Sequence, residues 1–144
     1  MLSPRDVVEQ VRRMVAGEAL SFADLFAEDG VLEYPFAVPG QPGRLQGREA
    51  IRAWFAAAPR STSLFQVENV DALVRETDDP EVVVAEIEHH GHSHALGGPY
   101  RFRALGVIRV RDGEIVSYDD YMDPIALAAL LGRTPDLVTA LSAA

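Results

Sequence analysis

The pattern of apolar and polar positions divides the chain into a helical first part and a second part made of strands. In the first part, apolar residues recur every three to four positions, which is the period of a helix with one buried face. After Pro59 the spacing changes to long alternating segments, each bounded by a turn rich in Gly, Pro or Asp. Helices followed by an antiparallel meander indicate an α+β domain, with helices on one face of a curved sheet.

The same pattern predicts the extent of each element. The expected helices are one capped by Ser3 and ended by Gly17, a short one over 22–26 with an exit at 28–30, one over 46–58, and a closing one over 125–131. The expected strands cover 31–36, 63–75, 81–93, 100–111 and 114–122, and residues 38–43 are expected to form a loop.

Composition restricts the function classes. A chain of 144 residues with 48% hydrophobic and 24% charged residues is expected to form a single domain, 1–144, with its own core. The net charge of −9 argues against nucleic acid or an anionic membrane as a partner. The absence of cysteine excludes disulfides, thiolate chemistry and cysteine-based zinc sites. Without a signal-type or membrane-spanning apolar run, we expect a cytoplasmic protein with a small-molecule or protein partner.

The last expected strand carries the first chemical candidate. Alternation places Val116, Tyr118, Asp120 and Met122 on one face of that strand. Burying a carboxylate is costly unless it is paired or neutralised, and the floor of a pocket is one reason to bury it. An apolar pocket would raise the pKa of Asp120, so that it could act as a general acid or base near neutral pH. The alternative is a carboxylate that bonds a helix end or a tyrosine.

His89 is the second candidate. It continues the inward set of the strand over 81–93, and a His–Asp pair with Asp120 would be a natural proton-transfer unit. The alternative is a buried histidine with a structural role. The nearby His90, His92 and His94 alternate at about 7 Å and suggest a shared ion, but a polar outer face or rim is the favoured reading, or a response to pH near 6. We expect no metal site.

Several sequence segments together resemble the NTF2-like superfamily, in particular its SnoaL-like and ketosteroid isomerase-like branch. The matching segments are 25–31, 46–51, 98–100, 112–115 and 120–124. The resemblance implies a cone-shaped α+β fold, in which a curved antiparallel sheet carries helices on its concave face and encloses a mostly apolar pocket. It implies no cofactor, and one such pocket hosts many functions.

The resemblance also bears on individual residues. The SnoaL-like cyclases and limonene-epoxide hydrolases carry a functional aspartate in an Arg-Asp-Tyr stretch, which here reads Asp119-Asp120-Tyr121. The arginine and aspartate of the epoxide hydrolases fall at Ile87 and His89, which argues against epoxide hydrolysis.

Comparison with the ketosteroid isomerases gives three further departures. Their proton-shuttling aspartate falls at Tyr34, their oxyanion-binding tyrosine at Gln10 and their oxyanion aspartic acid at Gly106. These departures argue against steroid isomerase chemistry as such. Tyr34 is expected to line the pocket, and its hydroxyl could donate a hydrogen bond to a substrate oxygen. The expected walls, some of them core, are Phe36, Trp54, Phe55, Phe102, Tyr118 and Met122.

The sequence therefore predicts a small-molecule enzyme that performs cofactor-free acid–base isomerisation or cyclisation of a polyketide-, terpenoid- or steroid-like substrate. Asp120, His89 and Tyr34 are its candidate catalytic residues. The alternative is a non-catalytic, dimeric binding module for a hydrophobic ligand. A homodimer is expected through the outer sheet face, where Leu105 and Val107 lie. Phenazine-biosynthesis proteins of the same superfamily, which end in a similar strand followed by Asn-Pro, are expected to be distant relatives.

Overall fold

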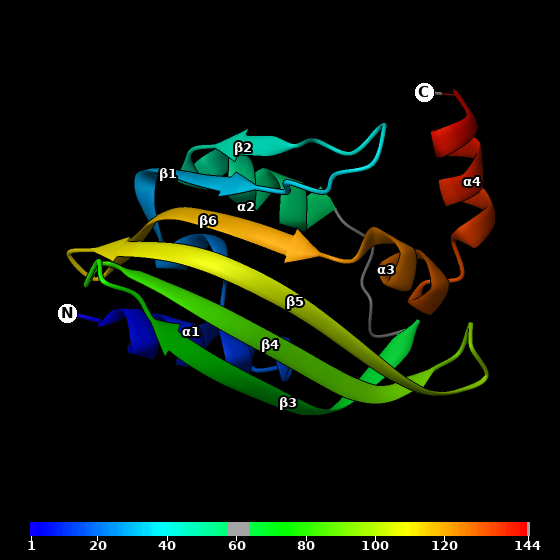
Figure 1. Cartoon of the computed structure of the whole chain (residues 1–144), viewed down its shortest axis with the longest axis horizontal. Helices are drawn as coiled ribbons and strands as arrows, with labels where there is room; N and C mark the ends of the chain where they lie inside the picture. Colours follow the sequence, from blue (N-terminus) through cyan, green and yellow to red (C-terminus); the bar gives the residue numbers. More distant parts are fainter. Residues whose placement is uncertain (58–63, 144) are drawn as a thin grey trace.

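A computed structural model describes residues 1–57 and 64–143 and shows a curved six-stranded sheet with four helices (Figure 1). The helices are α1 (Pro4–Val15), α2 (Arg48–Ala57), α3 (Pro124–Leu130) and α4 (Thr134–Ala143), with a 3-10 turn at Ala23–Leu25. The strands are β1 (Phe26–Glu33), β2 (Arg44–Gln46), β3 (Phe65–Glu76), β4 (Val82–Ser93), β5 (Gly98–Arg111) and β6 (Glu114–Met122). The expected α+β fold class is confirmed.

The strand order in the sheet is β2-β1-β6-β5-β4-β3. Strands β3 to β6 form the expected antiparallel meander. One pairing differs from an all-antiparallel sheet, because β1 runs parallel to β6. Parallel neighbours need a long connection, and here the chain passes through β2, α2 and the meander before it returns beside β1.

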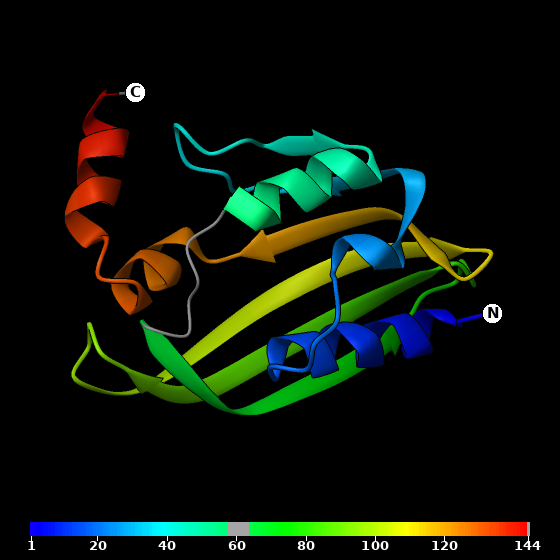
Figure 2. The ribbon, with the colours of Figure 1, turned by 180° about the vertical axis from the view of Figure 1, so that it is seen from behind.

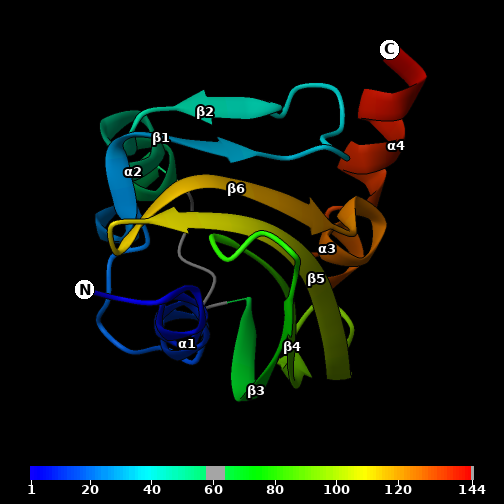
Figure 3. The same ribbon diagram turned by 60° about the vertical axis from the view of Figure 1, so that its left-hand side comes forward.

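Helices α1 and α2 both lie on the same face of the sheet, called here the inner face (Figures 2 and 3). Ser3 and Asp6 form a capping box at the start of α1, and Pro4 occupies its first turn. The apolar stripe of α1 is fully buried at Val7 and Val8, which explains why this helix packs flat against the meander.

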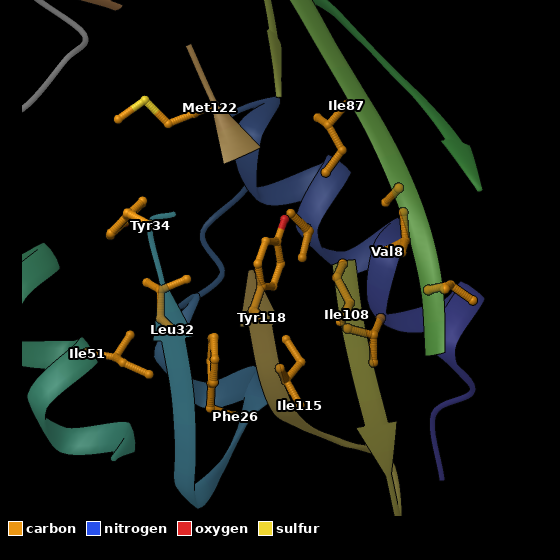
Figure 4. Packing of buried hydrophobic residues seen from close by; sticks show 14 of the residues in the cluster. Val8, Phe26, Leu32, Tyr34, Ile51, Ile87, Ile108, Ile115, Tyr118 and Met122 are labelled. Atoms are coloured by element: carbon orange, nitrogen blue, oxygen red, sulfur yellow. The ribbon is translucent and has the colours of Figure 1, made fainter. Parts of the chain in front are cut away.

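The core fills the space between these helices and the inner face. Figure 4 shows Phe26, Leu32 and Ile51 meeting between β1 and α2, while Tyr118 and Ile108 continue the layer across β6 and β5. All five side chains are at most 5% exposed. This layer fixes the position of β6, the strand that carries the main chemical candidate.

Two predictions about the segment between α1 and β2 were wrong. The short helix predicted over 22–26 is only a 3-10 turn, and Phe26 instead opens β1. The predicted exit at 28–30 lies within β1, where the pairing with β6 shifts register. The physical reason is tertiary: Phe26 is fully buried beside Ile115, and that burial outweighs its helical spacing from Phe22.

Two further elements were not predicted. Strand β2 forms within the Gly- and Pro-rich region as a three-residue edge strand beside β1. Helix α4 follows Gly132 and buries none of its residues. Because no face of this helix packs on the core, its sequence lacks the apolar spacing that would predict a helix. The predicted helix end at Ala58 and strand start at Ser63 lie outside the described residues.

The curvature of the meander depends on a close backbone contact between β3 and β4. The register shifts between Val67 and Asn69, which leaves an extra residue on β3. Opposite this bulge, a Cβ atom at Gly91 would lie only 1.9 Å from the carbonyl oxygen of Gln66. Glycine is therefore required there for the two strands to approach.

Candidate functional site

Asp120 lies on the inner face of β6, where Tyr118 and Met122 flank it in the alternating pattern that the sequence predicts. Its partner on β5 is Gly106. The carboxylate is partly buried, and within residues 1–57 and 64–143 no hydrogen bond or charge acts to lower its pKa. Burial raises the pKa of Asp120 to about 6. A carboxyl group with such a pKa can both accept and release a proton near neutral pH.

Tyr34 comes next to Asp120 through the parallel pairing of β1 with β6. Leu32 pairs with Tyr118 and Glu33 with Asp119, so the register leads from Tyr34 to Asp120. Tyr34 is only 8% exposed. Burial raises its pKa well above the usual range, the charge of Asp120 adds to the rise, and a hydrogen bond with Trp54 opposes it. Its phenol therefore stays protonated at neutral pH and remains a hydrogen-bond donor.

Tyr118 completes this group, and Gly106 makes room for it. A Cβ atom at Gly106 would lie 3.0 Å from Cε1 and 3.1 Å from both Cζ and Oη of Tyr118. Burial first, and then the charges of Asp120 and Tyr34, raise the pKa of Tyr118 far above its ordinary value. In the resemblance to ketosteroid isomerases, Gly106 stands where their oxyanion aspartic acid falls. Here the phenol of Tyr118 occupies the space that a side chain at this position would need.

Aromatic rings surround this group on one side. Phe22 makes edge-to-face contacts with Phe26, Phe55 and Tyr118, at centroid distances of 5.0, 5.3 and 5.5 Å. Phe55 and Trp54 remain 42% and 37% exposed on α2. Phe22 is the aromatic neighbour of Tyr118 that sequence reasoning missed, because its helical spacing suggested only a core position.

Of the other predicted wall residues, two lie in the inner layer and one lies outside it. Phe102 and Met122 are 8% exposed and belong to the inner layer. Phe36 does not reach it: its ring is 60% exposed and packs 5.5 Å from Tyr121, which alternates away from Asp120 on β6. The structure therefore does not bring Phe36 together with the other predicted wall residues.

His89 lies on the inner face, but it does not form the predicted pair with Asp120. The register places His89 opposite Phe102, whereas Asp120 lies opposite Gly106, four residues along β5. With about 3.3 Å per residue and about 4.8 Å per strand, the two Cα atoms are about 16 Å apart. Instead, Nδ1 of His89 lies 2.8 Å from Oη of Tyr100. Burial lowers the pKa of His89, and the neighbouring His90 lowers it further.

The remaining histidines do not converge. His90 contacts Asn69 at 3.3 Å, and the rings of His92 and His94 are 5.8 Å apart on exposed residues at the end of β4. Among the described residues, no group of three His, Cys, Asp or Glu side chains has a geometry that could hold a metal ion.

Two open cavities are lined by described residues, and both lie near the start of α1. One, of about 330 Å³, lies between the first turn of α1 and the β3–β4 turn, and the other lies against the β5–β6 turn. Neither includes Tyr34, His89 or Asp120. The apolar pocket expected around Asp120 therefore stays a prediction. None of the described helices is long and apolar enough to cross a membrane.

Comparisons with known proteins agree with this architecture. The chain is 34% identical over 126 residues to an uncharacterized PhzA/B-like protein of Pseudomonas aeruginosa, covering 88% of this chain and 87% of that protein. It is 33% identical over 119 residues to the uncharacterized protein YesE of Bacillus subtilis, covering 83% and 80%. The PhzA/B-like relative is consistent with the resemblance to phenazine-biosynthesis proteins.

Solved structures give the same picture. A candidate isomerase from Bacillus subtilis is 29% identical, with a TM-score of 0.74 over 93% of this chain and 98% of that one. A candidate polyketide cyclase from Pseudomonas putida shares the fold at 18% identity, with a TM-score of 0.66 over 91% and 99%. A model of the SnoaL-like domain matches residues 7–118, from within α1 to Tyr118 in the middle of β6. The chain therefore belongs to the SnoaL-like family of NTF2-like proteins.

Proposed function

We propose that this protein catalyses cofactor-free proton transfer next to a carbonyl group of a hydrophobic small molecule, leading to isomerisation or cyclisation. The observation that carries the proposal is the grouping of a desolvated carboxylate, Asp120, with two buried phenols, Tyr34 and Tyr118. Family membership supports an enzyme of this general kind. The largely apolar inner layer supports a hydrophobic substrate, such as a polyketide-, terpenoid- or steroid-like compound.

The proposed step assigns a role to each group. Asp120 accepts a proton from the carbon next to the carbonyl, and the C–H electron pair becomes the new C=C bond. The carbonyl π pair moves onto oxygen, and the hydroxyls of Tyr118 and Tyr34 donate hydrogen bonds to the enolate that forms. For isomerisation of a β,γ-unsaturated ketone, the intermediate is a dienolate, and protonated Asp120 returns the proton to its γ carbon. For cyclisation, the enolate carbon attacks a second carbonyl, and the alkoxide that forms takes the proton from Asp120, which regenerates the carboxylate.

Proton exchange tests this step without knowledge of the natural substrate. We suggest 2-tetralone, an apolar ketone with an acidic CH2 group, dissolved in D2O and followed by NMR. The wild-type protein should accelerate its exchange over buffer, with a rate that rises as pH increases through about 6, where Asp120 ionises. Asp120→Asn should lose about a hundredfold or more of that acceleration. The exposed turn variant Asp78→Asn is the matched control and should retain it.

Two results would contradict the proposal. One is full exchange activity in Asp120→Asn, and the other is a wild-type rate equal to that of buffer. Capture of the ketone without exchange would favour the second candidate, a binding module without turnover. The absence of the isomerase residues at Gln10 and Gly106 is the observation that favours this candidate.

For the assembly, we propose a homodimer through the outer sheet face. Leu73 and Leu105 are 50% and 36% exposed on this face, and the register places them in one row with Glu86 between them. Tyr121 continues the row on β6. A second copy of this surface would remove these apolar side chains from water.

A further inference from the structure

The inner face carries a second polar group, at the end remote from Asp120. His89 and Tyr100 form a 2.8 Å hydrogen bond, and three aromatic contacts hold the imidazole in place. Phe65 stacks on it at 5.9 Å with an interplanar angle of 19°, Phe102 lies tilted at 5.3 Å, and the ring of Tyr100 stands edge-on at 5.5 Å. The orientation of His89 is therefore fixed by packing on several sides.

The hydrogen bond to Tyr100 uses only one of the two ring nitrogens. Nδ1 faces Tyr100, and no hydrogen bond within the described part of the chain reaches Nε2 of His89. In a neutral imidazole, Nε2 donates or accepts depending on the tautomer, so it can bond a hydroxyl or a carbonyl oxygen. Because burial lowers the pKa of His89, a neutral oxygen is a better partner for it than a carboxylate.

The pattern of exposure on the inner face relates the His89–Tyr100 pair to Asp120. On β4, β5 and β6 most inward side chains are buried, including Ala85, Phe102, Ile108 and Met122. Apart from Gly98 at the start of β5, which has no side chain, the inward positions that keep partial exposure are His89, Ala104 and Asp120, one on each strand.

These three positions form a diagonal across the sheet. Their registers are successive, because His89 faces Phe102, Ala104 lies two residues further along β5, and Asp120 faces Gly106, two residues beyond that. Each step crosses one strand and advances two residues, about 8 Å between Cα atoms. At the midpoint, Ala104 contributes only a methyl group.

We propose that this diagonal is the substrate-binding track, and that His89, oriented by Tyr100, recognises an oxygen at the far end of the substrate. The inference rests on the proposed reaction at Asp120 and adds a class of substrate to it. The preferred molecule is elongated and apolar along its body. It carries the reacting carbonyl at one end and a hydroxyl or carbonyl oxygen at the other.

Two steroid ketones of the same skeleton provide the test. Androst-5-ene-3,17-dione has oxygens at both ends, whereas androst-5-en-3-one has only one, and their dissociation constants can be compared by NMR titration. The wild-type protein should bind the diketone about tenfold more tightly, as expected for one additional hydrogen bond in a buried site. His89→Phe keeps an aromatic ring for stacking and should bring the ratio of the two dissociation constants to about 1. Tyr100→Phe removes only the positioning hydroxyl and should reduce it in part.

A variant that only disturbs the fold should weaken the binding of both steroids and leave the ratio of their dissociation constants unchanged. The exposed variant His92→Ala is the control and should keep the wild-type ratio. Ala104→Leu should weaken the binding of both steroids, because its larger side chain enters the middle of the diagonal. Thermal unfolding of each variant verifies that it folds.

Equal affinity of the wild type for the two steroids, binding of neither, or an unchanged ratio in His89→Phe would overturn the inference. The 2-tetralone exchange of the wild type separates this result from the proposed function. Exchange without steroid discrimination leaves the reaction standing and removes the role of His89. Discrimination without exchange leaves the binding track and removes the reaction.

Discussion

Replacing Asp120 with asparagine should stabilise the protein near neutral pH while it removes the proposed activity. The folded state raises the pKa of Asp120 from 3.8 to about 6 by desolvation. A shift of about 2 units corresponds to about 3 kcal/mol of unfavourable free energy when the carboxylate is ionised in the folded protein. Asparagine has nearly the same shape and carries no charge, so it avoids this cost.

The sign of the effect depends on pH. Between about pH 4 and 6 the folded state binds more protons at Asp120 than the unfolded state does, so the contribution of this group to stability falls as pH rises. Below the unfolded pKa both states are protonated and the cost disappears. Asp120→Asn should therefore gain about 3 kcal/mol over the wild type near pH 7.5 but only about 0.5 kcal/mol near pH 4.

Urea denaturation of both proteins at these two pH values measures the difference. The control is Asp78→Asn, at an exposed turn position, for which the stability change should be the same at both pH values. An Asp120→Asn variant that is no more stable than the wild type near pH 7.5, or whose gain is independent of pH, would refute the desolvation argument. It would also remove the physical basis for Asp120 as a base.

Three other variants test separate parts of the description. Tyr118→Phe should reduce 2-tetralone exchange about a hundredfold with little change in folding, if its hydroxyl stabilises the enolate; equal rates would exclude that role. Gly91→Ala should lower the free energy of unfolding, measured in urea, by about 2 kcal/mol or more, because its Cβ would meet the backbone oxygen of Gln66 at 1.9 Å; unchanged stability would mean that the β3–β4 contact can relax. Leu105→Glu should convert a dimer to a monomer in light scattering, and a wild-type protein that is already monomeric would reject the proposed interface.

The meander was predictable because its signals are local. Each long strand alternates, and the turn at Asp112 and Gly113 adopts the positive φ angles of 53° and 78° that this residue pair favours. The predicted strand over 114–122 coincides with β6. By contrast, β2 has three residues and α4 has no buried face, so neither leaves a pattern that a single sequence can reveal.

The arrangement of the candidate site was only partly predictable. Alternation correctly placed Tyr118, Asp120 and Met122 on one face, because that depends on β6 alone. The prediction for the fourth residue, Val116, was wrong, because the pairing with β5 shifts register at this point and Ile115 is the buried residue instead. The position of Tyr34 beside Asp120 depends on a parallel pairing between strands more than eighty residues apart, for which the sequence contains no local signal. The separation of His89 from Asp120 likewise depends on the combined register of three strands.

The carboxylates of the outer surface show what is unusual about Asp120. Hydrogen bonds from Arg111 and Arg109 lower the pKa of Glu81 to about 2, and Arg101 pairs with Glu88 in the same way. These arginines therefore pair with carboxylates at the surface, where water already stabilises the charge. Burial raises the pKa of Asp120 to about 6, and in the described part of the chain no arginine opposes this rise; the close neighbours of Asp120 are two phenols that keep their protons. An arginine there would stabilise the charge but lower the pKa of Asp120 and weaken it as a base, so a site without one is compatible with the proposed proton transfer.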